Sequence, residues 1–196
     1  MGSRREALDK LGQGTYGTEG EKLRWTYYDR MLVVGAVPNT QRLFTIPLGQ
    51  GGKTLADTNL TVAGMIPQGQ QLQVQEILVM YKSAATKATT NVQMFYDIME
   101  QTTVSVKLQN KESMLQVTLQ ELMGAATLFA LTPTAAGDNI PLIQPKYHGI
   151  FPVRPMIILA AMTPFEVTVQ HHVAPNAALA NDVIKIGLRG TLYRVS

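Results

Sequence analysis

The sequence contains no cysteine, and only 16% of its residues are charged. A chain without cysteine has no disulfide, no zinc site built on thiolates and no thiol nucleophile. It also lacks an uninterrupted apolar run of about 18 residues, so we expect no membrane-spanning helix. The first residues, MGSRREALDK, are polar and do not resemble a signal peptide. We therefore expect a protein that is made in a cytoplasm and stays soluble until it assembles.

A polybasic segment is also missing. The net charge is +3, with balances of +1 in residues 1–30, zero in 31–121 and +2 in 122–196. Proteins that bind nucleic acid through its phosphates usually gather Lys and Arg on one face or tail. The sequence carries no specific nucleic-acid motif, and it leaves open a basic face that only the fold would assemble.

Histidine is scarce, and two of the three histidines are adjacent, at the end of TPFEVTVQHH. In this stretch Phe165, Val167 and Val169 alternate with polar residues, which indicates a β-strand. A strand sends His171 and His172 to opposite faces, so the pair cannot hold one metal ion. We interpret them as the end of a strand.

Other catalytic patterns are absent or incomplete. GQGGKT, at residues 49–54, lacks the first glycine of a phosphate-binding loop, because Pro47 occupies that position. The motif G-x-S-x-G is absent, and Glu76 and Glu166 are expected to be solvated strand residues. The sequence predicts no catalytic, cofactor-binding or metal-binding residue, no cofactor and no enzyme activity.

Alternating apolar and polar residues recur along most of the chain and predict an all-β protein. A chain of 196 residues with 45% hydrophobic residues can bury one sizeable core. The segment at 92–99 is rich in aromatic residues, which favours a strand, although its length also allows a helix. The expected strands are 42–48, 71–81, 92–99, 103–108, 114–119, 156–160, 164–171 and 183–194.

Long, uneven connections separate these eight strands, and a short helix is expected at 121–131. Eight strands in two facing sheets, joined by long crossovers, are typical of a jelly roll. We therefore predict a single eight-stranded jelly roll over residues 41–196, with an extended N-terminal arm over residues 1–40.

The expected arm combines a glycine-rich stretch, GQGTYGTEG, with the aromatic segment LRWTYYD. Aromatic residues are enriched at the centres of protein interfaces. Trp25, Tyr27 and Tyr28 are therefore candidate assembly contacts. The alternative is that these three side chains close the core of their own domain.

The C-terminal third carries a family resemblance. RPMIILAAMTPFEVTVQHHVAPN and DVIKIGLRGTLYRVS, with the hairpin SVKLQNKESMLQVTLQEL, resemble the single jelly-roll major capsid proteins of tailless, icosahedral, often membrane-containing bacteriophages. The positions that carry the resemblance are Pro155, Pro164, Phe165, Val167, Leu188, Gly190, Leu192 and Arg194.

The resemblance implies a structural virion protein whose copies assemble into capsomers and an icosahedral shell. Its implied partners are further copies, other capsid or penton proteins and an internal membrane, and its location is the virion. The near-neutral arm differs from the basic arms of small RNA-virus coats, which disfavours genome binding by the arm. The alternative is a phage decoration or spike protein, or a lectin-like binding module, for which Asp57, Asp138 and Tyr147 are the few loop residues available.

Overall fold

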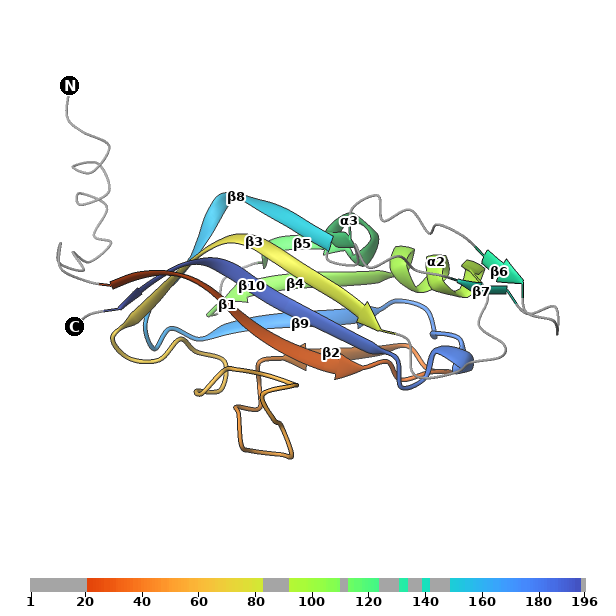
Figure 1. Ribbon diagram of the computed structural model, residues 1–196, viewed down its shortest axis with the longest axis horizontal. Coiled ribbons are helices and arrows are strands. Elements are labelled where there is room, and N and C mark those ends of the chain that lie inside the picture. The colour runs from red at the N-terminus through yellow and green to blue at the C-terminus, as the bar shows by residue number, and fades with distance from the viewer. Residues whose placement is uncertain are drawn as a thin grey trace, which may run out of the picture.

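The computed structural model describes residues 21–82, 92–109, 113–123, 131–133, 139–141 and 149–194. Over these residues the chain is all-β, with eight strands in two antiparallel sheets and few, short helices (Figure 1). The all-β sandwich predicted from the alternation is confirmed. A separate two-stranded sheet pairs β6 (Leu131–Pro133) with β7 (Asn139–Pro141).

Each of the two main sheets has four strands. The first sheet has the order β1 (Glu21–Leu32), β10 (Val183–Arg194), β3 (Gln70–Lys82) and β8 (Gly149–Leu159). The second has the order β2 (Asn39–Leu43), β9 (Phe165–His171), β4 (Thr102–Leu108) and β5 (Ser113–Thr118). Of these eight strands only β4 and β5 follow each other within one sheet, so nearly every connection crosses between the sheets.

The core lies between the two sheets and is formed by the inward-facing half of each alternation. In β10, Ile184, Ile186 and Leu188 are fully buried, while β9 contributes Val167 and Val169 from the other sheet. Full burial of one such side chain contributes about 1.5–3 kcal/mol. Both β9 and β10 lie between two other strands of their sheets.

The first sheet bends where its register shifts. In the pairing of β10 with β3, Arg189 faces Glu76 and Gly190 faces Val74, which leaves Gln75 as a bulge. At Gly190 a side chain would not fit, because a Cβ atom there would lie 1.7 Å from the carbonyl oxygen of Gln73. Residues 153–156 of β8 are unmatched beside the same point of β3. Figure 1 shows β8 bending sharply there, with β3 curving beside it.

The prediction of a strand at 92–99 is wrong, because this segment is the helix α2 (Val92–Glu100). Met94, Ile98 and Met99 recur at helical spacing, and Ile98 and Met99 are buried in the core. A helix can therefore bury the apolar side chains of this segment along one side, as a strand would along one face.

A second helix, α3 (Leu119–Met123), follows β5 directly. Thr118 and Glu121 cap its start reciprocally: the Thr118 N–H donates to Glu121 Oε2 at 2.8 Å, and the Glu121 N–H donates to Thr118 Oγ1 at 3.1 Å. The helix expected at 121–131 thus begins two residues earlier, and residues 124–130 lie outside the described residues.

The N-terminal arm is not confirmed. Residues 1–20 lie outside the described residues, and residues 21–32 form β1, which pairs with β10 over its whole length.

Two further strand boundaries differ from expectation. The strand expected at 42–48 ends at Leu43, because Phe44 has a φ of +64°, and the strand expected at 156–160 begins at Gly149.

Candidate assembly surface

The three aromatic residues proposed as assembly contacts lie on β1 and contact their own domain. Tyr27 is buried, and its hydroxyl donates to Gln70 Oε1 at 2.7 Å. Burial raises the pKa of the Tyr27 phenol, against the opposing charge of Arg194, so the hydroxyl remains a donor. Trp25 meets the Tyr27 ring edge-on, with 6.3 Å between ring centroids.

Tyr28 points to the other side of β1, where its hydroxyl donates to the carbonyl oxygen of Leu55 at 2.6 Å. The ammonium of Lys185 lies 3.7 Å from the centre of the Tyr28 ring. These contacts favour the alternative in which the aromatic segment completes its own domain. A role for the partly buried Trp25 and Tyr28 in contacts with a neighbouring subunit stays a prediction.

The outer edge of β1 is occupied by the loop between β2 and β3. The Asn59 side chain donates to the carbonyl oxygen of Thr26 at 2.8 Å and accepts from the Tyr28 N–H at 2.9 Å. The Asn59 backbone N–H also donates to the Tyr28 carbonyl oxygen, at 3.4 Å. A single asparagine thus replaces part of a missing neighbouring strand, which protects this edge from pairing with another chain.

A buried ion pair fastens the same loop to β1. The Asp29 carboxylate is 2% exposed and accepts hydrogen bonds from the Lys53 ammonium at 2.7 Å and from the Phe44 N–H at 2.6 Å. Lys53 also donates to the carbonyl oxygen of Arg30 at 2.7 Å. A buried carboxylate requires such partners, because an unpaired charge in the core is costly.

This network also explains the glycine-rich segment at 49–54. Gly49, Gly51 and Gly52 have φ values of +82°, +54° and +74°, and they form turns that deliver Lys53 to Asp29. Lys53 is therefore engaged with the protein itself. The pairing of Lys53 with Asp29 could hardly be predicted from the sequence. Its one indication is that Asp29 occupies a position of β1 where the alternation calls for an apolar residue.

The opposite side of the sandwich presents two strand edges. Helix α3 packs against both β8 and β5, which therefore lie on the same side, while β1 contacts β2 on the other. Among the described residues, no strand pairs with the outer edges of β8 and β5. We call this side the open edge.

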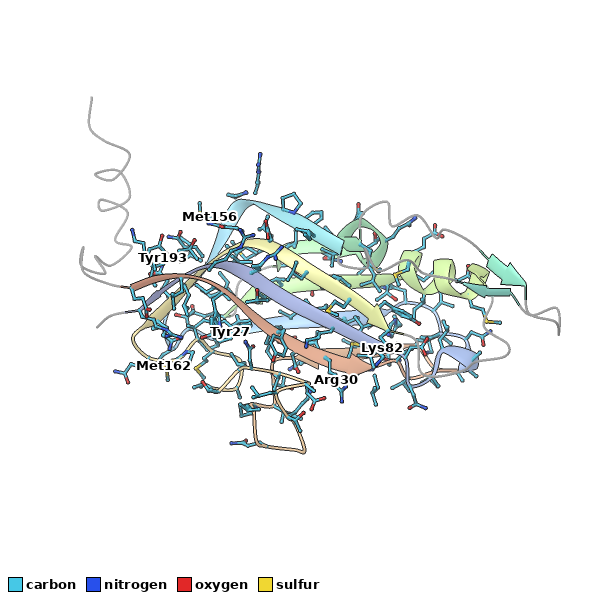
Figure 2. All side chains as sticks on the ribbon, in the orientation of Figure 1. Tyr27, Arg30, Lys82, Met156, Met162 and Tyr193 are labelled. Atoms are coloured by element: carbon cyan, nitrogen blue, oxygen red, sulfur yellow. The ribbon has the colours of Figure 1, made fainter. Side chains whose placement is uncertain are left out.

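Three exposed apolar side chains flank the open edge. Met114 on β5 is 49% exposed, and Ile150 and Met156 on β8 are 52% and 49% exposed. Figure 2 places Met156 at the bend of β8. Pro152 and Pro155 deprive β8 of two N–H donors. A partner at the open edge would therefore contact side chains rather than add a continuous strand.

The two histidines lie at the end of β9 with one side chain buried and the other exposed, as the alternation predicts. His171 is 2% exposed and its Nδ1 lies 2.7 Å from Thr102 Oγ1, whereas His172 is exposed and its Nε2 lies 2.9 Å from Thr103 Oγ1. His148, Asp138 and Tyr147 lie outside the described residues.

The two carboxylates considered as a catalytic pair lie on the outer faces of different sheets. Glu76 contacts Arg24 and Arg189, and Glu166 contacts Arg42. They cannot act on one substrate. In the part of the chain that the structure describes, no three His, Asp or Glu residues gather to hold a metal ion, and no helix is long and apolar enough to cross a membrane.

The chain was compared with protein-family models, with curated proteins and with solved structures. None of them matches. The features available for a functional argument are therefore the pairing of the strands, the one protected edge and the open edge.

Proposed function

We propose that the two sheets form a single jelly roll. The support is the symmetry of the strand pairing about the hairpin of β4 and β5. Moving outward along the chain from that hairpin, β3 pairs with β8, β2 with β9 and β1 with β10. A long antiparallel hairpin rolled into two sheets produces these four pairs, and such rolling is what distinguishes a jelly roll from other sandwiches.

We further propose that the protein is a capsid subunit that self-assembles into capsomers of an icosahedral bacteriophage shell. The observation that carries this proposal is the rolled pairing together with its two unlike sides. On one side the loop held by the Asp29–Lys53 ion pair covers the edge of β1, and on the other the strand edges are open and flanked by Met114, Ile150 and Met156. A shell subunit needs a rigid body with edges that meet copies of itself. The fold alone does not imply this function.

In this proposal the partners are further copies, together with other capsid or penton proteins and an internal membrane. The protein works in the virion after synthesis in the host cytoplasm, and it has no catalytic turnover. Contacts at the open edge would join neighbouring subunits through apolar side chains, because prolines interrupt β8.

The test is to measure mass and shape by light scattering and negative-stain electron microscopy across salt and protein concentration. We expect rings, sheets or shells. The double variant Ile150→Glu/Met156→Glu should remain a dispersed subunit, because charged side chains would be buried in the contact. Both positions are exposed, so the variant should keep the unfolding temperature of the original chain.

Leu55→Glu serves as the matched control, because Leu55 is 63% exposed on the opposite side, where the loop between β2 and β3 covers the edge of β1. This variant should assemble like the original chain. A protein that remains a monomer under every condition would contradict the capsid proposal. A small compact oligomer that binds a glycan would favour the lectin-like module instead.

A further inference from the structure

The positive charge of the chain is gathered on one face. Strand alternation places outward side chains of β1, β10 and β3 on the outer face of the first sheet, which we call the basic face. The basic side chains that these three strands place on it are Lys22, Arg24, Arg30, Lys82, Lys185 and Arg189. Only Glu76 on β3 and Asp57 from the adjoining loop oppose them, through ion pairs with Arg24, Arg189 and Arg30. The balance of six bases and two acids is +4, against +3 for the whole chain.

The outer face of the second sheet is different. Its charged side chains are Arg42, Lys107 and Glu166, a balance of +1. The other outward positions of its strands are mostly hydroxyl and amide residues, such as Thr103, Ser105, Thr168, Gln170 and Gln116. The two faces of the sandwich therefore differ in charge, although no run of basic residues occurs in the sequence.

Like charges stand directly opposite each other on the basic face. Arg30 pairs across the strands with Lys185, an arrangement that costs free energy unless an anion lies nearby. The Asp57 carboxylate fills that role for Arg30. Burial lowers the pKa of Lys185, and the Arg30 charge lowers it further, whereas the Asp57 and Asp29 carboxylates oppose this shift.

The cations also follow the strands in rows. Lys22 and Arg24 are two residues apart on β1, a spacing of about 6.8 Å along an antiparallel strand. Between the rows lie hydrogen-bonding groups, with Gln75 donating to Thr191 at 3.2 Å and Tyr193 donating to Gln73 at 3.1 Å. Figure 2 shows Tyr193 and Lys82 toward opposite ends of the sheet.

We propose that the basic face binds the sugar–phosphate backbone of a nucleic acid, without regard to base sequence. Lys and Arg together with hydroxyl and amide side chains are the groups that contact phosphate and sugar in such complexes. An anionic membrane fits less well. Surface-bound proteins usually insert apolar or aromatic side chains, and the exposed apolar side chains of this face, Leu32 and Met80, lie at the end away from Lys22 and Arg24. On this face the rings of Tyr28 and Tyr193 lie beside the ammonium groups of Lys185 and Lys22.

This inference stands apart from shell assembly, because an isolated subunit carries the complete face. The test is fluorescence anisotropy of a labelled oligothymidylate mixed with the full chain, over a series of NaCl concentrations. With four net charges, the plot of log affinity against log salt should have a slope of about −3, which is about a fifty-fold loss of affinity between about 50 and 200 mM NaCl.

The variant Lys22→Gln/Arg24→Gln should bind at least about tenfold more weakly and reduce the slope to about −1.4, because two phosphate contacts are lost. The matched control is Arg42→Gln/Lys107→Gln on the other face. It also removes one exposed Arg and one exposed Lys, and Arg42 is 67% exposed beside Glu166 much as Arg24 is 71% exposed beside Glu76. The control should bind within about twofold of the original chain.

Three results would overturn the proposal. The first is the absence of oligothymidylate binding at low salt, and the second is an equal loss of affinity in the two double variants. The third is binding only to vesicles of phosphatidylglycerol and phosphatidylcholine in equimolar mixture, which would assign the face to a membrane. Circular dichroism of both variants shows that a loss of binding is not a loss of folding.

Discussion

Replacing Gly190 by alanine should destabilise the protein severely. The added Cβ atom would lie 1.7 Å from the Gln73 carbonyl oxygen, whereas contacts of real Cβ atoms do not fall below 3.0 Å. Strand β10 and strand β3 must therefore separate locally by more than 1.3 Å, the difference between these distances. Such a shift breaks ladder hydrogen bonds, each worth about 0.5–1.5 kcal/mol, and adds overpacking of about 1–3 kcal/mol.

We expect a total cost of about 3–5 kcal/mol, a large part of the stability of a typical domain. The assay is urea unfolding followed by far-ultraviolet circular dichroism. With an m-value of about 2 kcal/mol/M, the midpoint should fall by about 1.5–2.5 M. Fluorescence of Trp25, which pairs with Gly190, reports the same transition from the affected site.

Gly187→Ala is the matched control in the same strand. Its Cβ atom would meet the side-chain methyl group of Thr26 at 2.9 Å, and this side chain can rotate away. Both variants restrict the unfolded chain equally, so their difference measures how much the backbone clash at Gly190 exceeds the side-chain contact at Gly187. A midpoint for Gly190→Ala within about 0.3 M of the control would refute the reasoning.

Three further predictions concern the ionisable groups. Asp29→Asn should destabilise the fold by about 3 kcal/mol in thermal unfolding, because it leaves the Lys53 charge without its partner; an unchanged unfolding temperature would contradict this. Hydrogen bonds from Thr54 lower the pKa of Asp57 below 3.8. Its stabilisation should therefore be complete above that pH and be lost as the pH falls through the folded-state pKa, and Asp57→Asn should remove this acid-dependent loss from urea titrations. Burial lowers the pKa of His171 below 6.5, with a smaller contribution from His172. Its contribution should therefore be complete above pH 6.5 and decline as the pH falls from there; urea titrations of His171→Gln should lack this decline, and those of His172→Gln should keep it.

The long strands with a clear apolar pattern could be predicted closely from the sequence, even though β3 carries a bulge at Gln75. The expected strand 183–194 coincides with β10, and 71–81 differs from β3 by one residue at each end. In both strands the inward residues are apolar, so that a one-residue shift would expose the whole buried face. Local pattern alone determines such elements.

Elements that depend on distant contacts could not be predicted in this way. Strand β1 alternates too, but its fourth inward position is Asp29, whose role becomes clear only when Lys53 and the Phe44 N–H surround it. Strand β8 contains Pro152 and Pro155, which argue against a central strand and are accommodated because β8 lies at an edge. Residues 92–100 form a helix rather than a strand because of how this segment packs against the core.

The candidate surfaces depended even more on the fold. The three aromatic residues of β1 could be identified in the sequence, yet their burial requires the pairing with β10. The basic face gathers residues from three strands, two of which lie more than a hundred positions apart in the chain. Charges counted along the sequence cannot show such a face, because its residues come from segments that are distant in the chain.

The pairing of β1 with β10 has a consequence for synthesis. Strand β10 lies between β1 and β3 in the first sheet. The strand that joins these two is therefore missing until residue 194 has left the ribosome. At about 5–20 residues per second, β1 waits on the order of ten seconds or more for its partner. During translation its edges are available to chaperones and to aggregation, and the high contact order makes the final closure slow. A chain truncated before β10 cannot join β1 to β3 in the first sheet, so only chains that reach residue 194 can complete the fold.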